Sequence, residues 1–433
     1  METITVDDFR PQMVCQVMDA EFGALGCLVI DRTVGTNPCG GGIRLAPGLS
    51  VAEIAQLARV MTLKFGFLNF PHGGAKAGIT VADSLVQSHR KSIMAAFGRS
   101  LGILVKRNIY FFGEDMGTTL DDINAMQEAI GNTPHASGDE GTGYTALTVF
   151  ETIRQGALYR GAGFSSSTVA IEGFGKVGSE LALMLERAGA TIIAVSTADG
   201  ALYHPAGLDV SRLHILRREH GSELVFHYPD AQRIGQHELL HLPVEILVPC
   251  ARTWSIHAGN AGSIEARMIV PAANAPLTPE AERTLLRRGV LCLPDFVANC
   301  GAVLSSRMSS LGFGAGAIRR IVEGVFAEKV ALLLRTAEER GIPPLELARD
   351  VAWRNFGRMS EAYAPCAGER EREGMFRRLR RKGEKLLRDR LLYDLYYRKM
   401  LKVDRRGQDA FARFAGTLIG EIGADETGQR AVA

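Results

Sequence analysis

Two lysines, one aspartate and a glycine-rich loop are the residues of this chain whose types and order could do chemistry. Lys64 ends the segment Met-Thr-Leu-Lys, and Lys76 ends Pro-His-Gly-Gly-Ala-Lys. Asp115 lies in Glu-Asp-Met-Gly-Thr-Thr, and residues 173–178 read Gly-Phe-Gly-Lys-Val-Gly. Two amines, a carboxylate and a loop that can hold a pyrophosphate are the groups needed to move a hydride to or from the α-carbon of an amino acid.

Lys76 is expected to be a lysine of lowered pKa. Phe67, Leu68 and Phe70 precede it, which is an apolar setting for an amine. Burial, or a second cation such as Lys64, disfavours the charged form and can lower the pKa of a fully buried lysine by about 3–5 units. Such an amine can act as a general base near neutral pH, whereas a Lys64 that stays charged would hold an α-carboxylate. The competing interpretation is a pair of surface amines; for Asp115 it is a helix-capping role.

The glycine-rich loop stands in the context that dinucleotide binding requires. It follows an expected strand at 168–172 and opens an expected helix at 179–189. Gly173, Gly175 and Gly178 permit a tight turn and let backbone N–H groups reach a pyrophosphate. The acid that usually follows about 20 residues later is missing, because Thr197 stands near that place without an arginine beside it. Both NAD and NADP are therefore retained as cofactors.

Alternating short strands and helices must position these residues. A helix is expected from Ser50, with Glu53 completing a capping box, so that Lys64 lies near its end. Lys76 is expected to follow a glycine turn, and Thr142 to begin a helix that joins two domains. Further strands are expected at 27–30, 109–112, 191–195, 245–249, 268–270 and 289–293, and further helices at 316–340 and 344–359. This alternation predicts an α/β fold whose second part is a parallel, doubly wound sheet.

Composition limits the class of protein. A chain of 433 residues with 46% hydrophobic and 23% charged residues is an ordinary globular protein of about two or three domains. The first residues do not resemble a secretory signal, and no apolar run reaches the roughly 20 residues that span a membrane. The seven cysteines contain no Cys-x-x-Cys, which favours reduced thiols in a cytoplasmic protein and argues against a zinc site. No metal is expected.

Residues 369–406 form a basic segment with 15 Lys and Arg against 7 Asp and Glu. Apolar residues recur within it at helical spacing, which predicts an amphipathic helix or a pair of helices. The favoured interpretation is a helix that docks on the body or on a sister subunit. Contact with a membrane surface or with an acidic protein partner is the alternative. The rest of the chain is mildly acidic, so no nucleic acid is expected as a partner.

Eight motifs in order resemble the glutamate/leucine/phenylalanine/valine dehydrogenase family. They are G-G-I-R (residues 41–44), M-T-x-K, P-x-G-G-x-K, E-D-x-G-T-T, T-G-Y, G-x-G-x-x-G, A-N-x-P-x-T (273–278) and P-D-x-x-A-N-x-G (294–301). They cover about residues 20 to 310, and E-D-x-G-T-T is closest to the leucine and phenylalanine branch.

The resemblance implies a role for each matching residue. Lys64 would bind the substrate carboxylate, Lys76 would act with water as general base and acid, and Asp115 would shuttle the proton of the amine. Substrate contacts are also implied at Gly40, Gly41, Asn274 and Ser306. Cofactor contacts are implied at Thr142, Gly173, Gly175, Lys176, Val177, Gly178, Thr197, Asn274 and Asn299.

The resemblance also implies an organisation in domains. Residues 1–145 would form a substrate-binding and oligomerisation domain, and residues 146–305 a Rossmann-type dinucleotide-binding domain. Residues 306–365 would be helices packing back on the first domain. The resemblance does not extend to residues 366–433, which their composition predicts to be a basic amphipathic tail that is partly disordered. Members of the family form dimers, hexamers or octamers, so a homo-oligomer is expected.

The expected activity is reversible NAD(P)-dependent oxidative deamination of an L-amino acid to its 2-oxo acid and ammonia. Glutamate-specific members carry a lysine where this chain has Gly40. Burying a second carboxylate without that cation would cost several kcal/mol, and the missing side chain leaves room, so an apolar aromatic or branched-chain substrate is favoured. Ser306 argues for the alternative, glutamate, because glutamate-type members have serine there. A non-catalytic dinucleotide-sensing or scaffold protein is the third possibility.

Overall fold

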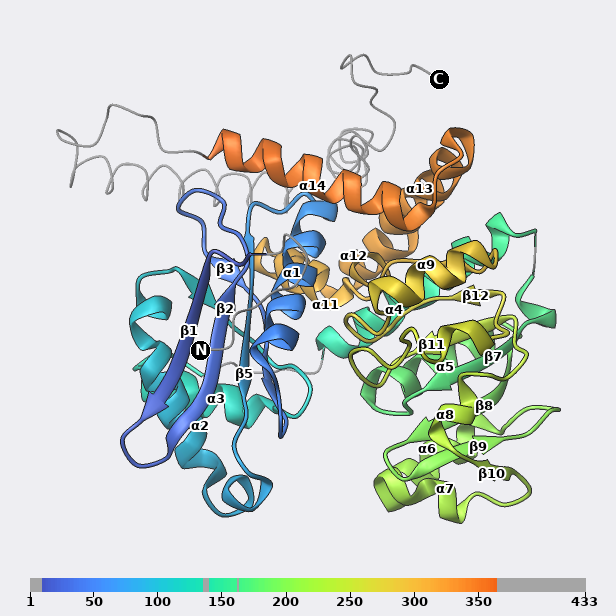
Figure 1. The fold of residues 1–433 in the computed structure, drawn as a ribbon, viewed down its shortest axis with the longest axis horizontal. Coiled ribbons are helices and arrows are strands. Elements are labelled where there is room, and N and C mark those ends of the chain that lie inside the picture. The colour runs from blue at the N-terminus through green and yellow to red at the C-terminus, as the bar shows by residue number, and fades with distance from the viewer. Residues whose placement is uncertain (1–9, 135–139, 162, 364–433) are drawn as a thin grey trace.

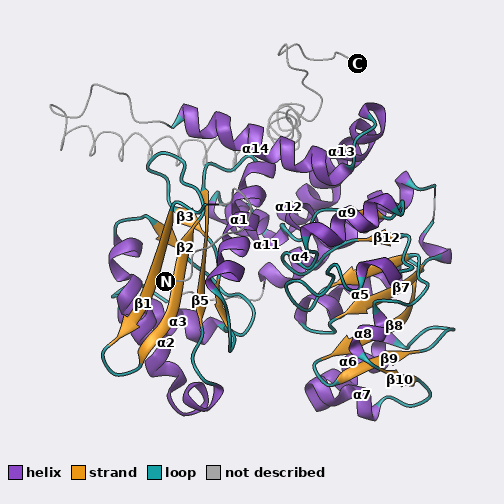
Figure 2. Ribbon diagram, viewed as in Figure 1, coloured by secondary structure: helices purple, strands orange, loops and turns teal. Residues whose placement is uncertain are grey.

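The structure is a computed structural model that describes residues 10–134, 140–161 and 163–363. Two α/β lobes lie side by side, and helices from the C-terminal part run above both (Figure 1). The first lobe (residues 10–134) is built on one sheet, and the second lobe (residues 163–300) on another (Figure 2). The basic segment 369–406 lies outside the described residues. Among the helices that the structure describes, none is long and apolar enough to cross a membrane.

The sheet of the first lobe has the order β1-β2-β5-β3-β6, with β4 paired to β5. Its strands are β1 (Met13–Asp19), β2 (Gly23–Ile30), β3 (Cys39–Gly40), β4 (Ile43–Leu45), β5 (Gly73–Ile79) and β6 (Tyr110–Phe111). Helix α1 (Val51–Phe67) covers one face, and α2 (Asp83–Lys106) and α3 (Leu120–Ala129) cover the other. Strand β2 is apolar throughout its second half because its alternate side chains are buried on the two faces.

Lys76 lies within strand β5, so the expectation that it follows a glycine turn is wrong. The whole of β5 is buried. A Cβ atom on Gly73 would lie 1.8 Å from the carbonyl oxygen of Arg32, and one on Gly74 would lie 2.2 Å from the backbone nitrogen of Thr62. The glycines are therefore required by close packing against neighbouring backbone, and not by a turn.

The sheet of the second lobe has the order β10-β9-β8-β7-β11-β12-β13. Its strands are β7 (Thr168–Glu172), β8 (Thr191–Thr197), β9 (Gly200–Tyr203), β10 (Gln232–Ile234), β11 (Ile246–Pro249), β12 (Met268–Ile269) and β13 (Leu291–Cys292). The five strands expected here are confirmed and run parallel. The sheet is nevertheless mixed, because a two-residue loop after Thr197 turns β9 back as an antiparallel hairpin and β10 pairs with it.

Helices connect and cover these strands. They are α4 (Glu140–Tyr159), α5 (Lys176–Arg187), α6 (Val210–His220), α7 (Leu224–His227), α8 (Gln236–Leu239), α9 (Pro279–Arg287), α10 (Asp295–Ala298), α11 (Gly301–Ser310), α12 (Ala315–Arg320), α13 (Ala327–Arg340) and α14 (Pro344–Ala362). Short 3-10 turns occur at Phe164–Ser166, Gly221–Glu223 and Ala261–Ser263, and a π-helical stretch at Ile321–Phe326 joins α12 to α13. The expected helices at 316–340 and 344–359 fall within this C-terminal series.

Ser50 caps α1 as expected, because its hydroxyl accepts a hydrogen bond from the backbone N–H of Glu53. The reciprocal half of the predicted capping box is not among the hydrogen bonds of this region. The Glu53 carboxylate instead accepts from Arg44 at 3.0 Å. Glu53, in the first turn of the helix, therefore contributes to an ion pair at the edge of the first sheet.

The other end of α1 is held by the C-terminal helices. Lys329 of α13, which is completely buried, donates to the carbonyl oxygen of Phe67 at 2.6 Å. Asn355 of α14 donates to the carbonyl oxygen of Gly66 at 3.1 Å. These side chains satisfy carbonyls that the last turn of a helix leaves without helical partners. The position of Lys64, in that last turn, thus depends on residues almost 300 positions further along the chain.

Candidate active site

A cleft of about 1110 Å³ lies between the two lobes. Most of the residues singled out from the sequence line it: Gly41, Lys64, Lys76, Asp115, Thr142, Gly175, Lys176, Val177, Asn274, Asn299 and Ser306. Gly40, Gly173, Gly178 and Thr197 do not line it. The cleft thus brings together residues from β5, α1, α4, α5 and α11; Lys64 of α1 and Ser306 of α11, for example, are 242 positions apart in the sequence.

Lys76 and Asp115 form a buried ion pair in this cleft. The amine of Lys76 lies 2.8 Å from Oδ1 of Asp115, and the Lys76 residue is only 2% exposed. Arg44 donates from Nε to the other carboxylate oxygen, Oδ2, at 2.8 Å. Each oxygen of Asp115 therefore has its own cation. The backbone N–H of Asp115 donates to the hydroxyl of Thr118, which fixes the loop that carries the carboxylate.

The pKa values of this pair follow from burial and from the neighbouring charges. Burial lowers the pKa of Lys76 below its ordinary value, and the charge of Arg44 acts in the same direction, while Asp115 opposes both. Burial would raise the pKa of Asp115, but Lys76 and Arg44 outweigh it and hold that pKa well below its usual range. The site therefore pairs an ionised carboxylate with an amine that releases its proton more easily than a free lysine.

Lys64 lies on the same wall of the cleft and contacts the second lobe. Its amine donates to Oδ1 of Asn274 at 2.8 Å and is 3.4 Å from the carbonyl oxygen of Asn299. Asn299 in turn donates from Nδ2 to the carbonyl oxygens of Ala272 and Ala273 and to Asn274 Oδ1. Burial lowers the pKa of Lys64 to about 8. Near neutral pH this amine is mostly charged and suited to a carboxylate.

The space beside Gly40 is filled, so the expectation that the missing side chain leaves room is wrong. A Cβ atom on Gly40 would lie 2.2 Å from the ring of Phe111. The Phe111 ring packs edge-on against the ring of His72, with centroids 5.4 Å apart, and Phe65 lies beside both. Phe111, His72 and Phe65 all line the cleft. An aromatic wall thus stands where a longer side chain at position 40 would project.

The glycine-rich loop forms a tight turn at the start of α5. Gly173 has a φ of +105°, which favours glycine, and its N–H donates to the hydroxyl of Ser196. A Cβ atom on Gly178 would lie 2.1 Å from the carbonyl oxygen of Gly173, whereas one on Gly175 would meet no atom within 4 Å. Gly175 is also the N-cap of α5 and offers no side chain to its N–H groups. The open face above Gly175 fits a pyrophosphate at the helix N-terminus.

Thr197 ends β8 next to this loop, outside the cleft. Its hydroxyl donates to the carbonyl oxygen of Ser222 at 2.7 Å and accepts from the N–H of Asp199. Gln236 donates to the carbonyl oxygen of Ala198 at 2.8 Å. These contacts shape the turn that follows β8, where the adenosine end of a dinucleotide lies in doubly wound folds.

Three residues in or near the cleft had no role in the sequence argument; Arg44 and Thr253 line the cleft, and Glu172 does not. Arg44 was named only within the motif G-G-I-R, and Thr253 was not named. Arg44 nevertheless donates to the Thr253 hydroxyl at 2.9 Å across the cleft. Glu172, at the end of β7, is buried, and its carboxylate accepts from the hydroxyl of Ser255 at 2.8 Å. Burial raises the pKa of Glu172 to about 7. An acid immediately before G-x-G-x-x-G was the available signal for Glu172; Thr253 offered none.

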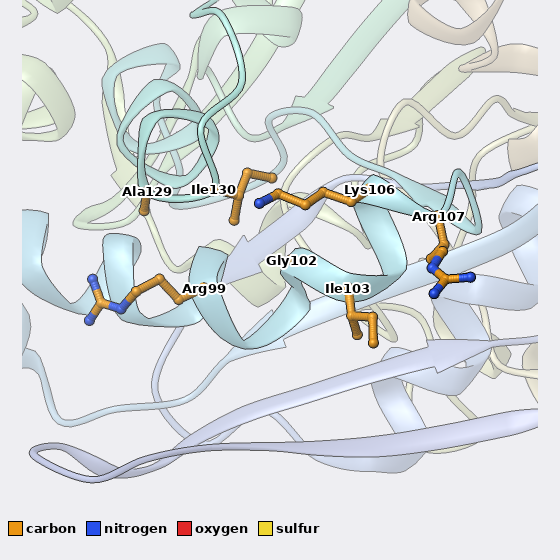
Figure 3. Close-up of a pocket in the computed structure, with 7 residues that line it drawn as sticks. All are labelled: Arg99, Gly102, Ile103, Lys106, Arg107, Ala129 and Ile130. Carbon is orange, nitrogen blue, oxygen red and sulfur yellow. The ribbon is translucent and has the colours of Figure 1, made fainter.

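A second hollow, of about 380 Å³, lies on the outer face of the first lobe between α2 and α3 (Figure 3). It is lined by Arg99, Gly102, Ile103, Lys106, Arg107, Ala129 and Ile130. None of these is a residue that the sequence singled out. Among the described residues, no group of three or more His, Cys, Asp or Glu side chains could hold a metal ion. The chemistry described above is therefore concentrated in the cleft between the lobes.

Comparison with known families matches both lobes. The Glutamate/Leucine/Phenylalanine/Valine dehydrogenase family matches residues 137–313, and the Glu/Leu/Phe/Val dehydrogenase dimerisation domain matches residues 28–132. Glutamate dehydrogenase of Thermotoga maritima is 35% identical over 293 residues, which are 64% of this chain and 70% of the relative. NAD-specific glutamate dehydrogenase of Staphylococcus aureus is 34% identical over 285 residues, which are 62% of this chain and 68% of the relative.

A solved structure has the same arrangement. Hetero-hexameric glutamate dehydrogenase from Thermus thermophilus, in its leucine-bound form, superposes with a TM-score of 0.70 at 28% identity and covers 81% of this chain and 89% of its own. The matched families and these relatives point to one family of dehydrogenases. The buried pair of Lys76 and Asp115 supplies the amine and the carboxylate that such chemistry needs. The chain belongs to the glutamate/leucine/phenylalanine/valine dehydrogenase family and is an NAD(P)-dependent amino-acid dehydrogenase.

Proposed function

We propose that this dehydrogenase catalyses the reversible oxidative deamination of an L-amino acid to its 2-oxo acid and ammonia, with L-glutamate as the first candidate substrate. The observation that carries the reaction is the buried pair of Lys76 and Asp115 at 2.8 Å, with Lys64 on the same wall of the cleft. Glutamate is favoured by the comparisons, because the relatives in Thermotoga and Staphylococcus are named as glutamate dehydrogenases. Ser306 lines the cleft, and its resemblance to the serine of glutamate-type members also favours glutamate.

An apolar L-amino acid is the second candidate, and one specific observation favours it. The rings of Phe111, His72 and Phe65 form the wall beside Gly40, where no lysine is present. A carboxylate buried against this wall would lose its hydration without gaining an ion pair there, at a cost of several kcal/mol. An apolar side chain would instead gain about 25 cal/mol for each Å² that it buries.

Three side chains divide the work on the substrate. The charged amine of Lys64 holds the α-carboxylate, which places the α-carbon in the cleft between the lobes. Asp115, ionised at neutral pH, takes a proton from the substrate ammonium so that the free amine is available. A nicotinamide cofactor held by the second lobe would supply the hydride acceptor for the α-carbon, and the substrate oxidised in this way carries an iminium group.

Lys76 then acts on water. Its amine, with a lowered pKa, takes a proton from a water molecule as that water forms a bond to the iminium carbon. The product is a carbinolamine. Asp115 returns a proton to the nitrogen, the carbon–nitrogen bond breaks, and ammonia leaves as the 2-oxo acid forms. The proton of the carbinolamine hydroxyl passes through solvent to the departing ammonia. Lys76 gives the proton that it took from water to solvent, which returns Lys76 and the ionised Asp115 to their starting states.

The cofactor would bind along the second lobe. Gly173, Gly175 and Gly178 form the turn at which the pyrophosphate meets the N-terminus of α5, and Lys176 and Val177 open that helix. Thr142, Asn274 and Asn299 line the cleft and would hold the nicotinamide end. Thr197 stands beside the adenosine end, and the absence of an acid at this position gives no ground for choosing NAD over NADP.

We also propose that the protein is a homo-oligomer. The match of residues 28–132 to a dimerisation domain supports assembly, and the Thermus relative, a hetero-hexamer, is also an assembled protein. Light scattering on the purified full-length protein measures the assembly directly. The retention of Lys76, Asp115 and Lys64 in one cleft argues against a catalytically silent sensor.

The test is turnover of a panel of L-amino acids with NAD and with NADP, followed by the absorbance of the reduced cofactor. Glutamate, leucine, valine, phenylalanine and tryptophan cover both candidates, and Lys76→Ala is the matched control. Turnover of glutamate that Lys76→Ala abolishes would support the first candidate, and turnover of apolar substrates the second. Dinucleotide binding without turnover of any amino acid would overturn the proposal in favour of a sensor.

A further inference from the structure

A chain of hydrogen bonds crosses the cleft and connects Lys76 in the first lobe with Asn274 in the second. It runs from Lys76 to Asp115, to Arg44, to the hydroxyl of Thr253, to the backbone of Asn274. The side chain of Asn274 then accepts from Lys64. The first three residues belong to the first lobe, and Thr253 and Asn274 to the second.

Arg44 is the junction of this chain. Its side chain is 5% exposed and makes three contacts with side chains: Asp115 Oδ2 at 2.8 Å, Glu53 Oε1 at 3.0 Å and Thr253 Oγ1 at 2.9 Å. Two of these partners lie in its own lobe. Thr253 is the one partner among the three that lies in the second lobe, so this contact exists only while the lobes lie together.

The direction of the Thr253 hydroxyl is fixed by its surroundings. It donates its proton to the carbonyl oxygen of Asn274 at 3.3 Å, which turns a lone pair toward Arg44. The neighbouring residue, Trp254, has a φ of +56° and donates from its backbone N–H to the carbonyl oxygen of Ala275 at 2.9 Å. The loop after β11 is therefore tied to the segment that carries Asn274, and the hydroxyl is presented to Arg44 in one orientation.

We propose that Thr253 is a positioning residue that acts through Arg44, and that it aligns the carboxylate of Asp115 for proton transfer when the cleft is closed. The inference rests on the proposed function, since it assigns Asp115 its role in deamination. Alignment of the Asp115 carboxylate then depends on closure of the cleft. With the lobes apart, Arg44 keeps its hydrogen bonds to Glu53 and Asp115 but loses the one to Thr253, which fixes its guanidinium group from the second lobe.

The matched pair of variants is Thr253→Val and Thr253→Ser. Valine keeps the shape and removes the hydroxyl, whereas serine keeps the hydroxyl. Loss of a hydrogen bond to a charged group predicts a fall in kcat of roughly tenfold for Thr253→Val. The change in KM should be smaller, because Thr253 contacts the backbone of Asn274 and not the side-chain oxygen that Lys64 binds. The acid limb of the pH profile should also move to higher pH, since a displaced Arg44 depresses the pKa of Asp115 less. Thr253→Ser should behave as the wild type.

Hydrogen–deuterium exchange supplies a readout that does not depend on turnover. The loop at residues 113–119 lies across the cleft from Thr253, and the N–H of Asp115 donates to Thr118 within it. Thr253→Val should speed exchange in this loop severalfold relative to wild type and Thr253→Ser. Equal exchange and equal kcat in both variants would overturn the inference, as would a Thr253→Ser variant as impaired as Thr253→Val. If Thr253→Val speeds exchange in this loop but the wild-type protein turns over no amino acid, the positioning role of Thr253 would stand and only the proposed function would be refuted.

Discussion

The amine of Lys76 lies 2.8 Å from a carboxylate oxygen of Asp115, although Lys76 is in the middle of a buried strand and Asp115 is in a loop 39 residues further along the chain. The strand gives the amine a fixed position. Parallel pairing of β3 with β5 and with β6 brings the two segments to one edge of the cleft. Arg44, from β4, occupies the second oxygen of the carboxylate, so its orientation is also fixed.

Replacing either member of this pair should abolish turnover while leaving the fold intact. Lys76→Met and Asp115→Asn keep the approximate shape of each side chain, and general acid–base groups contribute about 10²- to 10⁴-fold to the rate. We expect kcat to fall by at least about a hundredfold in each variant, measured as the rate of cofactor reduction. Wild-type circular dichroism and retained dinucleotide affinity are the controls, and near-normal kcat in Asp115→Asn would remove that residue from the mechanism.

The pH dependence of substrate capture should report Lys64. Burial lowers its pKa to about 8, and an amine carries its charge only below its pKa. The charge that holds the substrate carboxylate is therefore lost as pH rises through about 8, and kcat/KM should fall above that pH. Lys64→Arg keeps a charge throughout this range and should lack the fall at high pH, even if its activity is lower. A wild-type kcat/KM that stays level to pH 9.5 would contradict the assignment.

Glu172 should make the protein less stable as pH rises toward neutrality. Burial raises its pKa to about 7 in the folded protein, from an ordinary value of 4.5. Between these two values the folded state binds more protons than the unfolded state, so the free energy of unfolding falls with rising pH and the loss is complete above about 7. Glu172→Gln removes this titration and should stabilise the protein at pH 8 by up to a few kcal/mol, while having little effect at pH 4.5.

Denaturant unfolding of wild type and Glu172→Gln at several pH values measures this difference. Glu180→Gln, a substitution on the exposed surface of α5, is the matched control and should not change the pH dependence. The same stability gain at pH 5 and pH 8 would show that Glu172 does not titrate in this range.

The substrate side chain can be tested at Gly40. A lysine there needs space that the Phe111 ring occupies, so the variant should combine Gly40→Lys with Phe111→Ala. The new cation should raise kcat/KM for glutamate relative to valine by at least about tenfold, since a site that pairs a substrate charge discriminates strongly against its absence. Phe111→Ala alone is the control. An unchanged ratio would mean that other groups already bind the glutamate side chain.

The sequence predicted the two lobes and most of the cleft because their signals are local. Strand–glycine–helix order at residues 168–187 identified the dinucleotide turn, and Ser50 identified the start of α1. The position of Lys64 then followed from counting along that helix. These features depend on a few adjacent residues, so a single sequence contains them.

Features that depend on distant contacts were predicted wrongly or not at all. Strand β5 was taken for a turn because glycine disfavours strands, yet close approach of Arg32 and Thr62 leaves no space for a Cβ atom. The space expected at Gly40 is filled by Phe111, 71 positions away. Thr253 gave no signal because its importance comes from one hydrogen bond between lobes.

The contacts of Lys329 and Asn355 with the last turn of α1 set a limit on how far the enzyme can be shortened. The family matches cover residues 28–132 and 137–313. Lys64, Lys76 and Asp115 lie in the first of these segments. A fragment cut after residue 313 would keep every reactive group yet expose the carbonyls of Gly66 and Phe67 and remove the helix that packs against α1. The smallest autonomous enzyme that can be excised from this polypeptide must therefore extend through α14.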